Sequence, residues 1–342
     1  MSARPDVTVV IPTRDRYDLL STAALPSALC QQDVDFEVVV VDDGSTDPIA
    51  ERLATLGEVR LRVIRHDRAR GVAQARNAGI RTAHGEWIAF LDDDDLWAPY
   101  KLRLQLEAAR AGEALFVYGG AAAVAEDRSW LYSLAPADPA RLRRSLLSRN
   151  VLWGGCSNVV VRADVLRRLG GFDERLFQLC DWDLWIRLAH AGNAAVCEQV
   201  LVGCIEHRRS MLLTSEDDVL DELDYLVAKH RETSEVEGVT FDRALFTRWV
   251  AIGHGRAGRR FHAAKVYLRG ALANRDPADV ARAFDALLSA RPSAWTRRAL
   301  RRPSPDGRLV NTTAEPTWLE LYRRTGARTS PQATSNGNSS TD

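Results

Sequence analysis

The stretch FEVVVVDDGSTD, residues 36–47, decides the fold class of this 342-residue chain. Four consecutive valines follow a phenylalanine and a glutamate, and two aspartates and a glycine come directly behind them. A nearly continuous apolar run that ends at turn residues suits a strand buried on both faces of a parallel sheet. The segment therefore predicts a sheet that helices cover on both sides.

Strands and helices alternate around this stretch through residue 95. The other expected strands are VTVVIP (7–12), LRVIRHD (61–67) and EWIAFLDDDD (86–95). The expected helices cover residues 18–32, 48–57 and 71–85. Pro26 should strain or kink the first of these helices, because proline cannot donate a backbone hydrogen bond. The alternation is typical of a doubly wound α/β sheet.

The rest of the chain continues the α/β pattern and then becomes helical. Further helices are expected at 99–111 and 181–191, and further strands at 114–124 and 196–208. From Asp217 to Ala290 almost the whole sequence has helical spacing, and the polar C-terminal end is predicted to be disordered. We therefore expect a first domain at 1–215, a C-terminal helical region at 216–325 and a disordered tail at 326–342.

The composition is that of a soluble globular protein, with 46% hydrophobic and 27% charged residues. No apolar stretch reaches the roughly 18 residues of a membrane span, and the N-terminus lacks the apolar core of a signal peptide. The five cysteines are odd in number and show no CxxC spacing. They are expected to be reduced thiols, which predicts a cytoplasmic protein.

The charges are unevenly distributed although the net charge is zero. From Phe241 to the end there are 18 Lys and Arg against 8 Asp and Glu, a balance of +10, so the first 240 residues carry −10. A basic C-terminal part can attract anionic lipid or nucleic acid, or can consist of solvated helix faces. Of the two ligands we expect lipid, as peripheral contact with the inner face of the membrane, and no nucleic acid.

Acidic and basic residues follow three of the expected strands. The first strand ends in PTRDR, the second in DDGSTD and the fourth in DDDD. Each segment alone is ordinary turn chemistry. In open α/β sheets, however, ligands bind beyond the carboxyl ends of the strands. These segments together therefore predict a negatively charged ligand edge, formed by Asp42, Asp43, Asp92, Asp93 and Asp94.

Such an edge needs a cation. Mg²⁺ or Mn²⁺ usually binds one or two carboxylates together with substrate phosphates, so the acidic cluster predicts a metal and the metal predicts a phosphorylated ligand. Arg70 and Arg76 lie near two glycines and a helix N-terminus, which suits them to bind phosphate. The alternative for these two arginines is a solvated helix face.

Six motifs in this order resemble family 2 glycosyltransferases, which are inverting enzymes with the GT-A fold. They are VVIPTRDR, VVVDDGSTD, GVAQARNAGI, GEWIAFLDDDDLW, GGFDERL and CDWDLWIRL. The resemblance covers roughly residues 5–212. It implies a Rossmann-like mixed sheet with helices on both faces, a nucleotide-sugar donor (most often UDP-linked) and a divalent metal, Mn²⁺ or Mg²⁺.

The resemblance also implies roles for single residues. Pro12, Thr13 and Arg14 are expected near the base and ribose, and Asp42 is expected to accept a hydrogen bond from the nucleobase. The DDDD run corresponds to the DxD motif, in which Asp92 and Asp93 face the ribose and donor sugar and Asp94 binds the metal, with the register open by one position. The other expected donor and metal contacts are Arg70, Arg76, Asn77 and His207.

The family places its catalytic base where this chain has Asp181, directly before a Trp-rich helix. The preceding acid of the family is replaced by Cys180, which leaves the base in place but removes any support from that acid. The alternative role for Asp181 is that of a helix N-cap, which Asp183 could share. His207 could equally be a structural histidine, and Arg208 or Arg209 could hold the leaving phosphate.

The sequence therefore predicts an inverting glycosyltransferase that moves a sugar to a glycan, lipid-linked or small-molecule acceptor, in cell-surface polysaccharide or glycoconjugate biosynthesis. The acceptor region is expected from about residue 96. One alternative is a sugar nucleotidyltransferase, which typically carries a Gly-rich loop after the first strand, whereas IPTRDRYDLL has no glycine. Another is a non-catalytic binding protein that has kept the fold.

Overall fold

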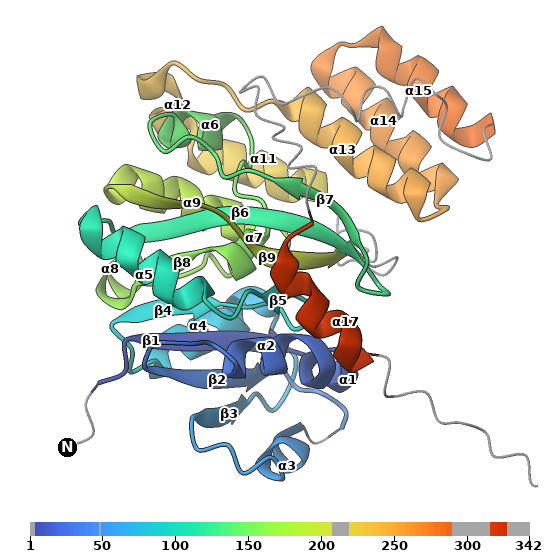
Figure 1. Cartoon of the computed structure of the whole chain (residues 1–342). Helices are drawn as coiled ribbons and strands as arrows, with labels where there is room; N and C mark the ends of the chain where they lie inside the picture. Colours follow the sequence, from blue (N-terminus) through green and yellow to red (C-terminus); the bar gives the residue numbers. More distant parts are fainter. Residues whose placement is uncertain (1–3, 48, 207–218, 289–314, 327–342) are drawn as a thin grey trace, which may run out of the picture.

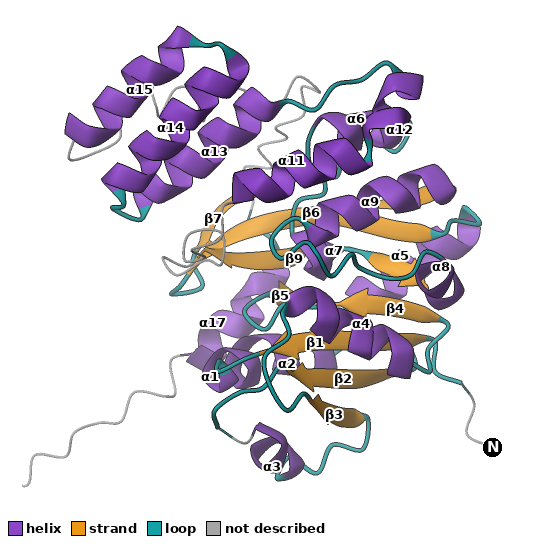
Figure 2. Ribbon diagram, turned by 180° about the vertical axis from the view of Figure 1, so that it is seen from behind, coloured by secondary structure: helices purple, strands orange, loops and turns teal. Residues whose placement is uncertain are grey.

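The computed structural model describes residues 4–47, 49–206, 219–288 and 315–326. Within these ranges nine strands form one sheet, in the order β3-β2-β1-β4-β8-β6-β9-β5, with β7 beside β6 (Figure 1). Helices lie on both faces of this sheet (Figure 2). This is the α/β architecture that the strand and helix pattern predicts.

The first four strands form the parallel part of the sheet. They are β1 (Val7–Thr13), β2 (Phe36–Asp42), β3 (Leu61–Arg65) and β4 (Trp87–Phe90). In the valine run, Val38 and Val40 face one side of the sheet and Val39 and Val41 the other, and all four are fully buried. A strand with both faces covered needs no polar positions, which explains the continuous apolar run.

The rest of the sheet is mixed. Its strands are β5 (Leu96–Trp97), β6 (Phe116–Ala125), β7 (Trp130–Leu134), β8 (Val160–Arg162) and β9 (Ala194–Glu206). β8 is antiparallel to both β4 and β6, whereas β6 and β9 are parallel. The sheet is thus not wound in one direction throughout, and the mixed sheet implied by the resemblance is confirmed.

Two expected elements differ from the prediction. The strand expected at 86–95 ends at Phe90, so the acidic run lies in the loop between β4 and β5. The helix expected at 18–32 is divided into α1 (Tyr17–Leu19), a π-helical turn η1 (Leu20–Ala24) and α2 (Leu25–Leu29). Pro26 falls in the first turn of α2, where its missing N–H and its ring are tolerated.

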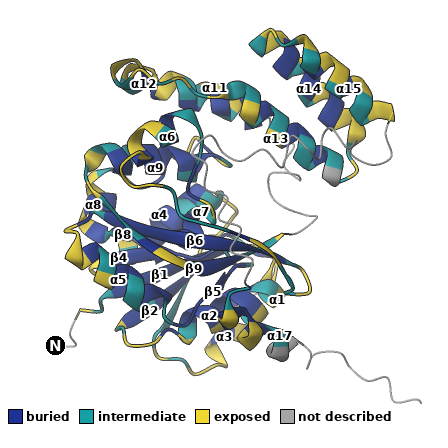
Figure 3. Cartoon of the chain, turned by 45° about the horizontal axis from the view of Figure 1, so that its top comes forward, coloured by how far each residue is buried: buried dark blue, intermediate teal, exposed yellow. Residues whose placement is uncertain are grey.

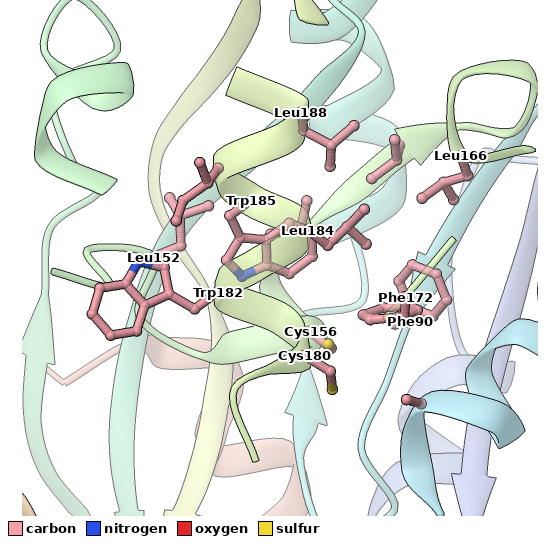
Figure 4. Packing of buried hydrophobic residues seen from close by; sticks show 14 of the residues in the cluster. Phe90, Leu152, Cys156, Leu166, Phe172, Cys180, Trp182, Leu184, Trp185 and Leu188 are labelled. Atoms are coloured by element: carbon pink, nitrogen blue, oxygen red, sulfur yellow. The ribbon is translucent and has the colours of Figure 1, made fainter. Parts of the chain in front are cut away.

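Helices connect the strands and build two apolar layers. On the sheet domain they are α3 (Ile49–Ala54), α4 (Val72–Thr82), α5 (Lys101–Ala111), α6 (Leu142–Ser148), α7 (Gly155–Asn158), α8 (Ala163–Arg168) and α9 (Cys180–Ala191). One layer packs α4, α8 and α9 on the sheet, with Trp182 and Trp185 fully buried in it and Phe90 and Phe172 edge to face at 5.1 Å (Figure 4). The other layer packs α2 and α5 on the opposite face.

The C-terminal helices are α11 (Val219–Lys229), α12 (Arg231–Glu237), α13 (Arg243–Arg256), α14 (Arg260–Asn274) and α15 (Pro277–Leu288). α13, α14 and α15 pack mainly on one another and project away from the sheet (Figures 1 and 3). The last described segment, η2 (Thr317–Leu319) with α17 (Glu320–Gly326), returns to the sheet domain. In the described parts of the chain, no helix is long and apolar enough to cross a membrane.

Candidate active site

The acidic run Asp92–Asp95 receives arginines from two other elements. The Arg16 guanidinium, in the loop after β1, lies 2.9 Å from an Asp93 oxygen and also pairs with Asp94. Arg76, on α4, is 5% exposed and donates from Nη2 to Asp92 Oδ1 at 2.7 Å. The chain itself therefore supplies two cationic partners for this run.

Two of the four aspartates have raised pKa values. Burial, only partly offset by the Arg16 charge, raises the pKa of Asp93 to about 7. Burial and the charges of Asp94 and Asp92 raise the pKa of Asp95 well above its usual range, and the Ser157 hydroxyl donates to Asp95 at 2.5 Å. The four carboxyl groups therefore do not carry four full negative charges near neutral pH.

The loop after β1 is tied to the acidic run and to the loop after β2. Thr13 Oγ1 donates to Asp93 Oδ2 at 2.7 Å. The Asp15 carboxylate accepts from the backbone N–H of Thr46 at 2.6 Å, and Ser45 Oγ accepts from the backbone N–H of Asp15 at 2.9 Å. Three loops that are far apart in the sequence are thus held together at the carboxyl edge of the sheet.

Asp42, the expected nucleobase acceptor, is fully buried at the end of β2. Its Oδ1 accepts from the Ser45 N–H at 2.8 Å, and its Oδ2 accepts from Arg65 Nη1 at 2.5 Å. A carboxylate offers about four lone-pair positions, so each oxygen keeps capacity for one more donor. These two hydrogen bonds fix the orientation of the Asp42 side chain, and its role toward a nucleobase stays a prediction.

Asp43 organises the turn that leads into α4. Its carboxylate accepts from the backbone N–H groups of Arg70 at 2.9 Å and Gly71 at 2.8 Å, and it contacts His66 Nδ1 at 2.7 Å. Gly71 has a φ of 97°, which favours glycine at this position. The backbone of Arg70 is therefore engaged by Asp43, while its side chain is exposed.

Arg76 and Asn77 are neighbours on α4 but serve different surroundings, because successive side chains on a helix point about 100° apart. Arg76 Nη1 also reaches Cys180 Sγ at 3.5 Å, so Arg76 lies between Asp92 and the start of α9. The Asn77 amide exchanges hydrogen bonds of 3.0 and 2.8 Å with the Phe172 backbone. The structure thus brings Arg76 to the acidic run and ties Asn77 to the turn before α9.

Asp181 lies in the first turn of α9, whose N-cap is Leu179, so the alternative role of N-cap does not hold. Its Oδ1 accepts from the Trp182 N–H at 2.6 Å. A Cβ on Gly155 would lie 3.5 Å from Asp181 Oδ2, so this glycine borders the carboxylate. Burial raises the pKa of Asp181 to about 6, although the charge of Arg76 lowers it.

Asp183, only two residues further on, has a different environment. It is fully buried and lies 2.7 Å from Arg187 Nη2, 2.7 Å from Lys229 Nζ and 2.8 Å from His230 Nε2. Burial alone would raise its pKa, but the hydrogen bond from His230 and the charge of Arg187 lower it to about 2. Asp183 thus joins α9 to α11 and α12 and is not free to accept a proton.

The remaining predicted residues are placed as follows. Pro12 is buried within β1, and the Arg14 side chain is 58% exposed, 3.7 Å from Asp15. His207, with Arg208 and Arg209, lies outside the described residues. The sequence did not single out Arg16, because nothing in PTRDR distinguishes it from Arg14. Ser157 is not singled out by the sequence either, although it belongs to the segment WGGCSN (153–158), which we expect near the donor or acceptor.

The described residues do not form a complete metal site by themselves. Among the residues that the structure describes, no three His, Cys, Asp or Glu side chains converge into a metal cage. Mg²⁺ and Mn²⁺ commonly take one or two carboxylates and complete their shell with substrate phosphates and water. The carboxylates of the acidic run fit a site of this kind.

The mixed sheet with helices on both faces is a GT-A fold. A crystal structure titled S. aureus TarS 1-349 in complex with UDP matches with a TM-score of 0.50 at 17% identity, over 82% of this chain and 89% of that chain. This likeness concerns the fold. Residues 8–170 match the family described as Glycosyl transferase family 2. The match covers a little under half of the chain.

Two curated relatives are similar over part of their length. The succinoglycan biosynthesis protein ExoO of Rhizobium meliloti is 40% identical over 153 residues, which is 44% of this chain and 44% of that protein. The UDP-Glc:alpha-D-GlcNAc-diphosphoundecaprenol beta-1,3-glucosyltransferase WfgD of Escherichia coli is 32% identical over 113 residues, 33% of this chain and 44% of that protein. The chain thus matches less than half of each relative.

The two acids of α9 should respond oppositely to neutralisation. A carboxyl group whose pKa the fold raises from about 3.9 destabilises the folded state as the pH rises toward 6. Asp181→Asn should therefore stabilise the protein at pH 7, by about 1 to 3 kcal/mol. Asp183→Asn should destabilise it by about 3 to 5 kcal/mol, because it leaves buried cations unpaired. Urea unfolding at pH 7 measures both.

The gain from Asp181→Asn should shrink as the pH falls and disappear near about pH 3, below both pKa values, where the carboxyl group is protonated in folded and unfolded chains alike. Equal losses of stability in the two variants would assign Asp181 a structural role instead.

Proposed function

We propose that this protein is a glycosyltransferase that transfers a sugar, with inversion, from a UDP-sugar to an acceptor hydroxyl in cell-surface polysaccharide or glycoconjugate biosynthesis. The observation that carries the proposal is that a carboxyl group with a raised pKa, Asp181, lies next to the acidic run at the same edge of the sheet. Asp181 is half-buried and has a pKa of about 6, and the acidic run lies beside it through Arg76. A pKa just below neutral suits a general base.

The donor class is supported by the relatives. The name of WfgD specifies UDP-glucose, and the structure of TarS contains UDP. The residues we assign to the donor are Pro12, Thr13, Arg14, Asp42, Arg70, Arg76, Asp92 and Asp93, within a catalytic domain that we place at residues 1–215. Asn77 would act indirectly by holding the turn at residues 171–174.

In the proposed mechanism Asp181 accepts the proton of the acceptor hydroxyl while that oxygen attacks the anomeric carbon. Inversion follows from one displacement, so no covalent enzyme intermediate is needed, and Cys180 has no nucleophilic role. Burial keeps the pKa of the Cys180 thiol high, at about 12, which agrees with this assignment. Arg76 offsets the mutual repulsion of Asp92 and Asp181, since its positive charge acts on both carboxylates.

Asp94, with Asp92 or Asp93, would hold the Mn²⁺ or Mg²⁺ ion, and His207 could complete its ligands. When bound, such an ion offsets the charge that develops on the leaving nucleoside diphosphate. Arg16 already bridges Asp93 and Asp94, so an ion would have to share or replace that contact.

We place the acceptor beyond about residue 96, next to Gly155 and Asp181. Trp153 is 50% exposed two residues before Gly155 and offers an aromatic surface against which a sugar ring could pack. The name of WfgD specifies a lipid-linked acceptor, which favours the lipid-linked class among the glycan, lipid-linked and small-molecule acceptors.

A lipid-linked acceptor would bring the protein to the inner face of the membrane from the cytoplasm. The outer faces of α14 and α15 expose Phe261, Leu272 and Leu288 at 82%, 83% and 82%. The cluster between α13, α14 and α15 instead contains mainly alanines. Large apolar side chains outside a small-residue interior, in a basic part of the chain, suit an anionic lipid surface.

Removing the proposed base should abolish most turnover. Asp181→Asn should lower kcat by about 10² to 10⁴, because Asn cannot accept the proton. Wild-type kcat/KM should fall as the pH drops below about 6, the pKa of Asp181. The residual activity of Asp181→Asn should not show this decrease. Asp164→Asn is the control, since Asp164 is another first-turn acid and half exposed. Turnover of Asp181→Asn within about threefold of wild type would refute the assignment.

Transfer should depend on a divalent metal, and substitutions of neighbouring aspartates in the acidic run should reduce it to different extents. EDTA should stop transfer, and Mn²⁺ or Mg²⁺ should restore it. Asp94→Ala should lose about 10²- to 10³-fold in kcat, whereas Asp95→Asn should be much milder because its buried carboxyl favours the neutral form. Nucleotide release across UDP-, GDP- and dTDP-sugars measures both effects and the donor class. Full activity in EDTA, or release from GDP-sugars alone, would contradict the metal or the donor.

The lipid contact can be tested with vesicles. The double variant Phe261→Ser/Leu272→Ser should bind vesicles with anionic lipid at least about tenfold more weakly than wild type in sedimentation. Val59→Ser is the matched control, because Val59 is 94% exposed on the sheet domain. If the wild-type protein stays in the supernatant, the membrane proposal is wrong.

A further inference from the structure

The segment from Glu315 to Arg323, here called the clasp, is buried on the sheet domain although it ends the described chain. Trp318 is 4% exposed, Leu319 is fully buried and Tyr322 is 6% exposed. These three side chains belong to the apolar layer that also contains Trp97 and Leu201. Figure 1 shows α17 running beside α2 and β5, far from α13–α15.

A glycine in β9 leaves room for the clasp on the sheet. A Cβ on Gly203, in β9, would lie 3.1 Å from the Trp318 ring and 3.3 Å from Leu319, so a larger residue would crowd both. The Trp318 indole N–H donates to the Val200 carbonyl at 2.9 Å. Gly203 is also the residue that pairs with Leu96 of β5. The clasp therefore packs at the point where β5 joins the sheet.

Polar contacts fix the clasp to β5 itself. The Tyr322 hydroxyl donates to the Trp97 carbonyl at 2.8 Å. Arg128 donates to the Tyr322 carbonyl and to the Thr22 carbonyl, each at 2.7 Å, and so links the clasp to the helical turn after β1. These contacts are directional and join groups 106 to 225 positions apart, which apolar covering alone would not require.

From Trp97 the contacts continue to the acidic run. The Trp97 indole donates to the Ser157 carbonyl at 2.7 Å. The Ser157 hydroxyl donates to Asp95 at 2.5 Å and accepts from the Asp92 N–H at 3.0 Å. One serine thus contacts both ends of the acidic run. Its backbone carbonyl accepts from Trp97, and the Trp97 carbonyl in turn accepts from Tyr322 of the clasp.

The strand β5 needs such support. It has two residues, and in the described sheet it pairs only with β9, at the edge. Two paired residues supply few hydrogen bonds, so neighbouring contacts must set the position of β5. We infer that the clasp positions the acidic run for the donor, with Tyr322 and Trp318 as positioning residues that act through Trp97 and Ser157. This inference rests on the proposed donor site at Asp92–Asp95.

The test compares Tyr322→Phe with Leu321→Ala in the full chain. Tyr322→Phe removes one hydroxyl and little volume, whereas Leu321, on the same helix, is 55% exposed and serves as the control. Hydrogen exchange followed by mass spectrometry should show faster exchange of the peptide covering residues 91–98 in Tyr322→Phe, with unchanged exchange in β1 and β2. Trp318→Ala should give a larger effect of the same kind where it folds.

Affinity for UDP with Mn²⁺, measured by calorimetry well below the unfolding temperature, supplies the second readout. Tyr322→Phe should weaken it about three- to thirtyfold, as remote positioning contacts do. The effects of Tyr322→Phe and Ser157→Ala should not add in the double variant, because both act on one connected chain of contacts.

A clasp that only covers apolar surface would leave exchange at residues 91–98 and UDP affinity within twofold of the Leu321→Ala control, and this outcome would overturn the inference. Failure of the wild-type protein to bind UDP would instead refute the proposed donor, while the exchange experiment would still decide whether the clasp holds the loop.

Discussion

The acidic run between β4 and β5 imposes the constraint on which the rest of the site depends. Two like charges about 4 Å apart repel by about 4 kcal/mol at an effective dielectric of 20. Four adjacent aspartates therefore need cations or protons. Arg16 and Arg76 supply the cations, and burial favours the protonated forms of Asp93 and Asp95. These arrangements bring the loop after β1 and helix α4 to the same edge of the sheet.

The same logic separates two acids of one helix. Asp181 and Asp183 are two residues apart on α9, yet the pKa of one is raised to about 6 and that of the other is lowered to about 2. Asp183 faces Lys229 and His230, so it anchors the C-terminal helices to the sheet domain. Asp181 lies near Arg76 and Gly155 and is half-buried. No cation in the described part of the chain pairs with it as closely as Lys229 pairs with Asp183. The two residues are of the same type, so their different surroundings explain why Asp183 has a structural role while Asp181 is the proposed catalytic base.

The donor edge also depends on segments that lie far along the chain. β5 is too short to hold the acidic run by backbone pairing alone, and the clasp packs against it from the C-terminal end. The helices α13–α15, by contrast, touch mainly one another and carry their large apolar side chains outward. In the C-terminal part of the chain, the clasp therefore completes the sheet domain, whereas helices α13–α15 form a unit of their own.

The sequence by itself determined the strands of the parallel half, the order of their elements and the helix that begins at CDWDLW, because burial periodicity and turn residues act over a few neighbouring positions. The valine runs of β1 and β2 and the CDWDLW segment show this. Only the tertiary structure decided that Arg16, and not Arg14, meets the acidic run, that β4 ends at Phe90, and that Asp183 is neutralised by residues near position 230. Charge pairing, burial and pKa depend on groups from elements that are far apart in the sequence. The local sequence does not determine which of these groups come into contact.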